Sequence, residues 1–362
     1  MHQNKTYKKL KTGFTTGTCA TAASKAAILS IMNQKKIDEI EVTLPNKKHV
    51  IMKINSCVFQ TKHSRCSVIK YGGDDPDVTH GAEIITDVYL TNHGNKIEIY
   101  GGKGVGIVTK PGLGLEIGKA AINNTPKKMI INNINELFSD LLKKNGIKII
   151  ISVPNGDKIA KHTDNPRLGI KNGISILGTS GIVIPYSTAS FAASIRQNLD
   201  VCVATNNTKI ALSVGSRSEE YIKNIIKIPN HCFVQMGDFA GYTMSQCVQK
   251  KIKMAYIVGL IAKFAKISTG IKQTHVKGSK VNMIFLSKLA KKCNTDSNTL
   301  KLIKTAHTAR HVYEIIKEKK MDNFFNELCI EVYKQMRKHS ESKIVLNVIL
   351  FDFDGNIIGR YP

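Results

Sequence analysis

The segment Gly13–Ala27, GFTTGTCATAASKAA, constrains the fold most, because a glycine- and threonine-rich turn leads directly into an alanine-rich stretch. This pattern predicts a helix from Thr18 to about Asn33. The first turn of a helix leaves four backbone N–H groups without partners, and the helix dipole adds partial positive charge there. The helix start must therefore be closed by a capping side chain or by a bound anion.

Two interpretations of this helix start remain open. In the first, a carboxylate or phosphate binds there, because Gly13 and Gly17 let the backbone come close to a ligand. The hydroxyls of Thr15, Thr16 and Thr18 would contact the anion, and the change Gly17→Val would weaken ligand binding more than it destabilises the fold. In the second, the segment is an ordinary helix start with Thr16 or Thr18 as its N-cap.

The formal net charge of +26 over 362 residues suggests an anionic partner. The length is typical of two or three domains. Nucleic acid is disfavoured as the partner, because only seven of the 53 basic residues are arginine, aromatic residues make up 6%, and tryptophan is absent. A small, highly anionic substrate, or a general lysine bias of the sequence, explains the charge better.

The eight cysteines form no CxxC motif and have no Cys–His spacing that suits zinc. The first residues are polar, and the sequence contains no run of about 18 apolar residues. We therefore expect a reduced, cytoplasmic protein with no membrane segment and no cysteine-based zinc site. The oligomeric state stays open, with a homodimer as one option.

Residues 1–186 contain short alternating runs that are typical of a mixed or antiparallel sheet. The predicted strands are Ile40–Leu44, Val50–Ile54, Cys66–Ile69, Ile84–Leu90, Lys96–Tyr100 and Ile147–Val153. Together with the first helix and a second one from Pro126 to about Lys144, they indicate an α+β domain.

Residues 187–362 alternate strand-like and helical segments, which is the pattern of a Rossmann-like α/β domain with a mostly parallel sheet. The predicted strands are Ile210–Val214, Cys232–Met236, Met254–Val258 and Ile344–Phe353, and the predicted helices are Ser218–Ile226, Lys280–Lys292 and Thr299–Lys319. The last helix would carry His307 and His311 four residues apart, which is more typical of a surface pair than of a metal site. An Asp-Gly turn would follow the closing strand.

Three carboxylates and an imidazole lie within the loop GGDDPDVTHG, at Asp74, Asp75, Asp77 and His80. Such a group could bind a divalent metal or act in acid–base chemistry. A solvated turn whose side chains cap backbone donors explains the same residues, and the chemistry alone favours the turn. The sequence GTSG at Gly178–Gly181 is likewise either a ligand-binding loop or a tight turn.

Several long motifs occur in a fixed order: GFTTGTCATAASKAA at Gly13–Ala27, GGDDPDVTHGAEI at Gly72–Ile84, GGKGVGIVTKPGL at Gly101–Leu113, AINNTPKKMI at Ala121–Ile130, and the segment Val153–Pro185. In their residues and their order these motifs resemble those of the CbiD family, and the resemblance extends over almost the entire chain. It implies methyl transfer from S-adenosylmethionine to carbon 1 of cobalt-precorrin-5B, which gives cobalt-precorrin-6A in anaerobic cobalamin biosynthesis. Such a displacement needs alignment of the reacting atoms but no covalent enzyme intermediate. The resemblance also implies no protein-bound metal, because the cobalt belongs to the tetrapyrrole substrate.

The second half departs from the family pattern at four positions, Ser216, Ser218, Leu260 and Val276. A second hypothesis therefore stays open, in which the chain is a degenerate family member that binds a tetrapyrrole without methylating it. The two hypotheses differ in whether the chain still binds the methyl donor.

The resemblance also implies candidate site residues for a substrate that carries many carboxylates. Lys110, Lys161 and Arg167 lie in matched motifs and are the predicted carboxylate contacts. The helix start with Thr15, Thr16, Gly17 and Thr18 could hold one more carboxylate. Asp75 or His80 could move a proton as the macrocycle rearranges.

The cofactor is expected in the second half, because ligands of open parallel sheets bind at the carboxyl ends of the strands. This rule predicts contacts at Gly215, Gly237 and Gly259, and Asp238 could bind a ribose hydroxyl. The remaining cofactor candidates are Thr274, His275 and the loop of Gly178, Thr179, Ser180 and Gly181, which would lie at the seam between the domains.

Overall fold

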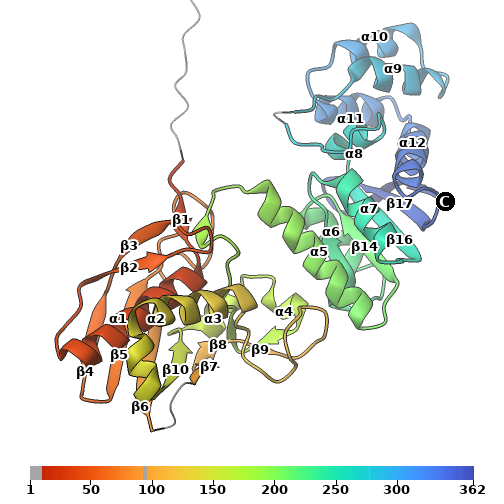
Figure 1. Ribbon diagram of the computed structural model, residues 1–362. Helices are drawn as coiled ribbons and strands as arrows, with labels where there is room; N and C mark the ends of the chain where they lie inside the picture. Colours follow the sequence, from red (N-terminus) through yellow and green to blue (C-terminus); the bar gives the residue numbers. More distant parts are fainter. Residues whose placement is uncertain (1–9, 93–95, 277) are drawn as a thin grey trace, which may run out of the picture. The chain divides into compact units, whose positions relative to one another are not determined.

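The structure is a computed structural model that describes residues 10–92, 96–276 and 278–362 (Figure 1). The chain divides into two compact units, Met1–Ser187 and Thr188–Pro362, which are described separately below. Helices combine with sheets of both parallel and antiparallel strands, so the chain is a mixed α/β protein.

The first unit is built on a five-stranded sheet with the order β4-β5-β6-β10-β7. Its strands are β4 (Ser56–Phe59), β5 (His63–Ile69), β6 (Glu83–Thr91), β7 (Ile97–Gly101) and β10 (Gly146–Ser152). Neighbouring strands are antiparallel except β7 and β10, which are parallel. Strands β2 (Glu39–Thr43) and β3 (His49–Lys53) form a separate antiparallel hairpin.

Helix α1 (Thr16–Asn33) is packed against β5 and β6, with α2 (Asn124–Lys144) beside it (Figure 1). Its alanines lack bulky side chains, so the helix lies close to its neighbours and is buried on nearly all sides. The predicted start at Thr18 is wrong by two residues. The helix begins at Thr16, because the hydroxyl of Thr15 accepts the Thr18 N–H and caps it.

Short strand pairs connect motif segments that are far apart in the sequence. They are β1 (Gly13–Phe14) with β13 (Ile182–Val183), β8 (Gly104–Val105) with β12 (Gly173–Ile174), and β9 (Ile107–Val108) with β11 (Ile170–Lys171). Two short helices, α3 (Gly156–Ala160) and α4 (Asn165–Leu168), lie between them in the chain. Sequence periodicity did not predict these pairs, because two residues are too few for a periodic signal.

The second unit has a five-stranded sheet with the order β15-β14-β16-β17-β18. Strands β14 (Lys209–Ser213), β15 (Phe233–Gln235), β16 (Met254–Leu260) and β17 (Val345–Phe351) are parallel, and β18 (Ile357–Tyr361) is antiparallel to β17. The predicted turn after the closing strand is confirmed, since the Asp352 carboxylate accepts the N–H groups of Asp354 and Asn356.

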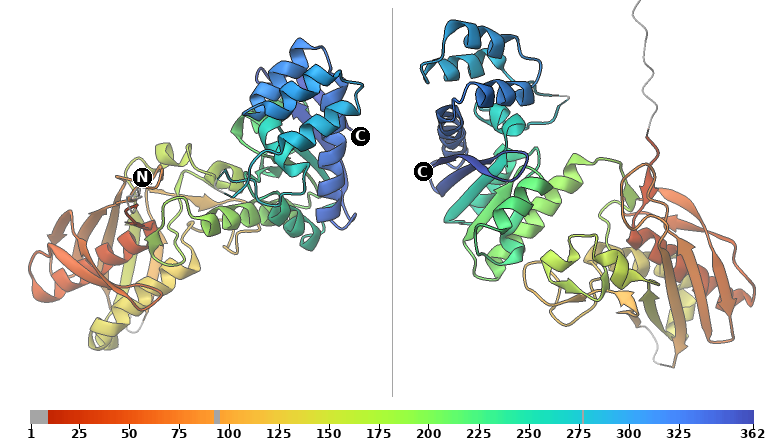
Figure 2. Two further views of the ribbon diagram at one scale, coloured as in Figure 1. Left: turned by 90° about the horizontal axis from the view of Figure 1, so that it is seen from above. Right: turned by 180° about the vertical axis from the view of Figure 1, so that it is seen from behind.

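The described part of the second unit also contains eight α-helices and one short 3-10 helix. They are α5 (Thr188–Ala204), α6 (Ser216–Lys223), η1 (Asn230–Cys232), α7 (Ala240–Gln249), α8 (Ile261–Ile267), α9 (Met283–Lys291), α10 (Ser297–Thr305), α11 (Ala309–Glu318) and α12 (Asn323–His339). The last of these, α12, packs against β17 and β18 near the C-terminus (Figure 2). In the described ranges, no helix combines the length and apolar character that crossing a membrane requires.

The predicted single helix Thr299–Lys319 is wrong, because the chain breaks it into α10 and α11. Ala306 takes an extended conformation after α10, and the Thr308 hydroxyl accepts the His311 N–H to start α11. His307 therefore lies between the two helices and not on a common helix with His311, and both side chains are exposed. Within the described residues, no group of three or more His, Cys, Asp or Glu side chains is placed to hold a metal ion.

Candidate functional site

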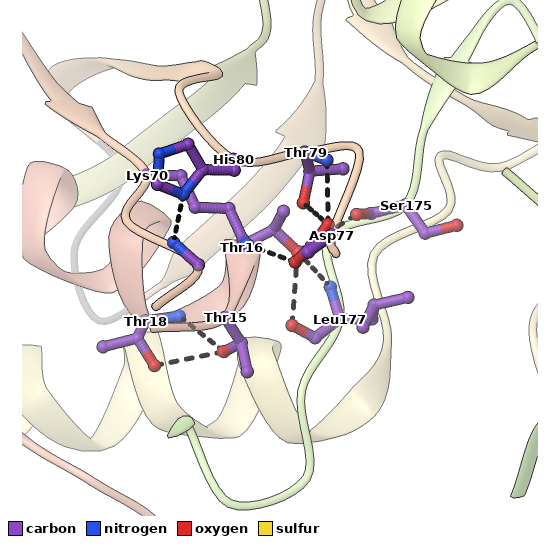
Figure 3. Close-up of polar contacts among 10 residues, drawn as sticks. Thr15, Thr16, Thr18, Lys70, Asp77, Thr79, His80, Ser175 and Leu177 are labelled. Carbon is purple, nitrogen blue, oxygen red and sulfur yellow. Dashed lines mark hydrogen bonds and ion pairs between the residues drawn. The ribbon is translucent and has the colours of Figure 1, made fainter. Parts of the chain in front are cut away.

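In the first unit, the start of α1 meets the loop 72–81 and the segment 175–181 (Figure 3). The Thr16 hydroxyl lies 3.1 Å from the Ser175 carbonyl oxygen and accepts the Leu177 N–H at 2.9 Å. The Thr18 hydroxyl donates to the Gly181 carbonyl at 2.7 Å. These contacts join segments about 160 positions apart in the sequence.

The backbone donors of this helix start are also used within the protein. The Gly17 N–H donates to the Leu177 carbonyl, and the Thr18 and Cys19 N–H groups donate to the hydroxyl and carbonyl of Thr15. The Thr15, Thr16 and Thr18 side chains are buried. The geometry therefore favours an ordinary capped helix start over an anion site, and the cap is Thr15, not Thr16 or Thr18 as predicted.

The glycines of this segment approach protein atoms, not open space. A Cβ atom added at Gly13 would lie 2.3 Å from the Gly72 carbonyl carbon, and one at Gly17 would lie 2.7 Å from Pro126 Cγ. A Cβ at Gly178 would lie 2.3 Å from the Thr15 hydroxyl oxygen. Close packing explains these glycines, and in the GTSG loop only Thr179 and Ser180 are exposed.

The carboxylates of the loop 72–81 accept backbone hydrogen bonds from three separate places. Asp74 accepts the Lys11 N–H at 2.7 Å, and Asp75 accepts the Tyr186 N–H at 2.9 Å. Asp77 accepts the Thr79 N–H at 2.8 Å. This is the capping arrangement that the sequence favoured, and each carboxylate serves a different partner.

A buried lysine, Lys70, supports this loop and was missed by the sequence analysis. Its side chain is 2% exposed, and its Nζ lies 2.5 Å from an Asp77 carboxylate oxygen (Figure 3). Burial alone would raise the pKa of Asp77, but the Lys70 ammonium and the Thr79 donors outweigh burial and hold that pKa below its ordinary value. No local sequence pattern distinguishes a buried lysine from the many exposed ones of this chain.

The two predicted proton carriers differ in their hydrogen bonds. His80 Nδ1 accepts the Gly72 N–H at 3.0 Å, so the neutral ring carries its proton on Nε2. The Nδ1 lone pair is thereby used within the protein. Asp75 uses only one oxygen for Tyr186, and its other oxygen has no partner among the described residues. The geometry favours Asp75 over His80 as a proton acceptor.

Two of the predicted carboxylate contacts, Lys110 and Arg167, lie on the segments that flank Gly169. The pairing of β9 and β11 brings these segments together, and a Cβ added at Gly169 would lie 2.4 Å from Lys110 Cγ. Arg167 precedes Gly169 by two residues at the end of α4, and both basic side chains are half-buried. Lys161 ends α3 and is exposed.

In the second unit, polar groups gather where the parallel strands end. Lys263 at the start of α8 donates to the Val214 carbonyl after β14 at 2.8 Å, and its Nζ lies 3.3 Å from an Asp238 oxygen after β15. The Thr274 hydroxyl donates to the same Asp238 oxygen at 2.7 Å, and the Thr274 N–H donates to the Asp238 carbonyl. The predicted Asp238 and Thr274 therefore contact each other directly, and Lys263, which was missed as a site residue, contacts the same carboxylate.

These contacts also set the charge of Asp238. Burial favours a higher pKa, but the Thr274 hydrogen bond and the charges of Lys263 and His275 outweigh it and lower the pKa of this carboxyl. Asp238 is thus an ionised acceptor at neutral pH, and its second oxygen has no partner among the described residues.

The three glycines predicted for this edge differ in their surroundings. A Cβ added at Gly215 would meet no atom within 4 Å, so the backbone there is open to a ligand. At Gly237 it would lie 2.8 Å from Phe191 Cζ, and at Gly259 it would lie 2.5 Å from Phe264 Cε1. Gly237 and Gly259 therefore serve packing, and Gly215 alone of the three has room for a ligand.

Comparisons with known proteins agree along the chain. The CbiD family model matches residues 3–185, and the model of the CbiD C-terminal domain matches residues 273–362. The protein named cobalt-precorrin-5B C(1)-methyltransferase from Leptospira interrogans is 43% identical over 359 residues, which cover 98% of this chain and 96% of that protein. The one from Priestia megaterium is 40% identical, with coverages of 98% and 96%.

The crystal structure of the cobalamin biosynthesis protein (cbiD) from Archaeoglobus fulgidus also matches. It is 24% identical with a TM-score of 0.39, and the match covers 86% of this chain and 85% of that chain. Because a family model matches half of the sequence and relatives about 40% identical align over 98% of it, the chain belongs to the CbiD family.

Proposed function

We propose that this chain transfers a methyl group from S-adenosylmethionine to carbon 1 of cobalt-precorrin-5B, giving cobalt-precorrin-6A. One observation carries the proposal: relatives with this methyltransferase name are 38–43% identical and align over 98% of the chain. The alignment includes the part that holds Ser216, Ser218, Leu260 and Val276. Nothing in the comparisons favours a degenerate protein that binds a tetrapyrrole without methylating it.

The methyl donor fits the strand ends of the second unit, which we interpret as a Rossmann-like nucleotide site. The second Asp238 oxygen, which has no partner in the described ranges, suits a ribose hydroxyl, and the open backbone at Gly215 allows close approach. When bound, S-adenosylmethionine supplies an electrophilic methyl group on a sulfonium. Lys263 and Thr274 hold the Asp238 carboxylate in place and ionised, so it is ready to accept hydrogen bonds.

We propose that the first unit supplies contacts to the substrate. Lys110 and Arg167 lie on the segments that flank Gly169 and suit the carboxylate arms of a tetrapyrrole, with Lys161 as an outer contact. Asp75 is the group that we propose takes up a proton, because its second carboxylate oxygen is available. The cobalt is part of the substrate.

Direct methyl transfer is consistent with the state of the cysteines. Burial raises the pKa of the Cys19, Cys247 and Cys329 thiols to about 12. They are protonated at neutral pH and poor nucleophiles, so none of them suits a covalent methyl carrier. The task of the protein is then to align the donor and acceptor atoms. Alignment can lower the activation free energy of methyl transfer by several kcal/mol, with an upper limit of about 7–11 kcal/mol.

The experiment is a transfer assay with labelled S-adenosylmethionine and a cobalt-precorrin substrate, with a named relative assayed in parallel. We expect label in the tetrapyrrole. No label with this chain, while the relative is active, would refute the proposed activity. Calorimetry with S-adenosylhomocysteine then separates the hypotheses, since a degenerate binder would retain tetrapyrrole affinity and lose donor affinity.

A further inference from the structure

A cavity of about 900 Å³ lies on the second unit, apart from the residues assigned above to the donor. It is formed by the first turns of α7, the residues that follow α8, and the end of α12. The lining residues are Gly241, Tyr242, Ser245, Thr269, Gly270, Lys272, Gln335, Lys338, His339 and Glu341. Polar groups from three elements therefore converge on one space.

The charges around this cavity do not balance. Neither Lys272 nor Lys338 has an ion pair or a side-chain hydrogen bond to another described residue. The one acidic lining residue, Glu341, is already paired with Lys343, which does not line the cavity. Two lysines thus line the cavity with no compensating carboxylate among the described residues, an arrangement that favours an anion.

A third group in the wall also lacks a partner. His339 Nε2 is shielded from solvent and has no hydrogen-bond partner in the described part of the chain. Burial, and then the nearby charges of Lys272 and Lys338, lower the pKa of His339. The Tyr242 hydroxyl and the Gln335 amide line the same space and likewise have no side-chain partner among the described residues. An unsatisfied buried nitrogen in a native structure calls for an explanation.

We propose that this cavity binds a multiply charged oxyanion between Lys272 and Lys338, with Tyr242 and Gln335 as further hydrogen-bond donors. Its volume exceeds what one water-sized group occupies, roughly 30 Å³, many times over, so a molecule with several carboxylates or phosphates fits better than a single small ion. Carboxylate and phosphate share this chemistry, and the experiment below distinguishes them. The site is independent of methyl transfer, so it can fail while the proposed function holds.

The first test is calorimetry on the full chain at constant ionic strength, with inorganic phosphate in one arm and butanetetracarboxylate in the other. We expect saturable binding of at least one of the two ligands at one site. The ligand with the lower dissociation constant shows whether the site prefers phosphate or carboxylate. The double variant Lys272→Met/Lys338→Met should raise the dissociation constant about tenfold or more, because two charge-assisted contacts are lost.

The matched control is Lys301→Met/Lys304→Met, which removes the same charge from exposed positions on α10. It should change the dissociation constant less than about twofold, since surface charges at a distance are screened by salt. Absence of saturable binding in both arms, or equal weakening by the two double variants, would overturn the proposal and leave only the general positive field. Thermal melting verifies that both double variants fold. If a double variant has a lowered melting temperature, the corresponding single lysine variants are used in the binding measurement instead.

The second test uses proton linkage. An anion between Lys272 and Lys338 offsets their charge and so raises the pKa of His339, while Glu341, the acidic residue of the same wall, is paired with Lys343. The His339 contribution is the difference in proton uptake between the parent protein and His339→Gln, because the proton exchange of the ligand itself is the same in both. Calorimetry in two buffers of different ionisation enthalpy measures the uptake of each protein, and we expect the parent to take up more protons on binding. Equal uptake in the two proteins would contradict the proposed site.

Discussion

The motif loops of the first unit and the strand ends of the second use similar residues in different ways. In the first unit, Gly17 lies against Pro126, and the threonines of the helix start donate and accept within the protein. In the second, Gly215 faces open space, and one Asp238 oxygen has no partner among the residues that the structure describes. A long motif can therefore report internal packing, whereas open polar groups at a sheet edge indicate a ligand.

The lysine–aspartate ion pairs of the two units also differ in their exposure to solvent. Lys70 is 2% exposed and Asp77 is 20% exposed, so this pair is held inside the first unit. Lys263 and Asp238 are 33% and 25% exposed, at a longer separation of 3.3 Å. The buried Lys70–Asp77 ion pair stabilises a loop, whereas the partly exposed Lys263–Asp238 ion pair is also accessible to a ligand.

The largest expected effect is on turnover and concerns Asp75. The variant Asp75→Asn keeps an oxygen to accept the Tyr186 N–H but cannot take up a proton. If Asp75 is the proton acceptor, kcat should fall by a factor of about 10²–10⁴ with donor affinity and melting temperature unchanged. Steady-state kinetics measure this, with Asp74→Asn in the same loop as control. Equal kcat values for the two variants would mean that Asp75 only caps the loop.

The next effect is on stability and concerns Lys70. The variant Lys70→Met leaves the Asp77 carboxylate half-buried without its cation, so the free energy of unfolding of the first unit should fall by about 3–5 kcal/mol. Denaturant titration measures this loss. The variant Lys143→Met, which removes an exposed partner of Asp140, should be indistinguishable from the parent protein. Loss of donor affinity in folded Lys70→Met would break the assignment of the donor to the second unit.

The same pair predicts a pH dependence with a definite sign. The pKa of Asp77 is lowered in the folded chain, so the stabilisation is complete above the ordinary carboxyl pKa of about 3.9 and is lost as the pH falls through the folded value. The difference in stability between the parent and Lys70→Met should therefore be full near neutral pH and shrink below about pH 4. A difference that stays constant into acid would contradict the ion-pair account.

A smaller effect is expected on donor affinity through Asp238. The variant Asp238→Ala removes the proposed acceptor of the ribose hydroxyls, and the dissociation constant of S-adenosylhomocysteine should rise about 10- to 100-fold. Calorimetry measures this change. The control is Asp200→Ala, because Asp200 also pairs with a lysine, Lys250, in the same unit but away from the strand ends. Equal effects of the two changes would remove Asp238 from the donor site.

The smallest expected effects compare one glycine from each unit. The change Gly17→Val should destabilise the fold by about 1–3 kcal/mol, because the new side chain overlaps Pro126, and leave donor affinity unchanged in the folded fraction. The change Gly215→Val should leave melting nearly unchanged and weaken donor binding, because its side chain occupies open space. Melting curves and calorimetry give the melting temperature and the donor dissociation constant of each variant. If Gly17→Val weakened donor binding and Gly215→Val destabilised the fold, the roles assigned to the two glycines would be wrong.

Much of the fold could be predicted from periodicity and composition. The alanine-rich helix α1 and the strands β14 and β16 form where the pattern indicates, because their signals are local. The break at Ala306 was missed because the apolar period continues across it, while the Thr308 cap decides the boundary. The pairing of β1 with β13 depends on contacts about 170 positions apart, which no local pattern contains.

Candidate site residues could be selected from the sequence where the expected order of strands and helices places them at a strand end. Asp238 follows β15, as the predicted strand Cys232–Met236 implied, and its role in binding the cofactor stays a prediction from the rule that ligands bind at strand ends. Lys263 was missed as a partner because its contacts to Val214 and Asp238 cross from one strand end to another. Lys70 was missed because burial of a lysine depends on the whole surrounding fold.

The most direct measurement is a crystal structure of the full chain with S-adenosylhomocysteine bound. The account predicts that the ribose hydroxyls lie within hydrogen-bond distance of Asp238 and that the ligand passes close to the backbone of Gly215. A ligand whose ribose instead contacts the loop 72–81 or the start of α1, with no density near Asp238, would contradict it.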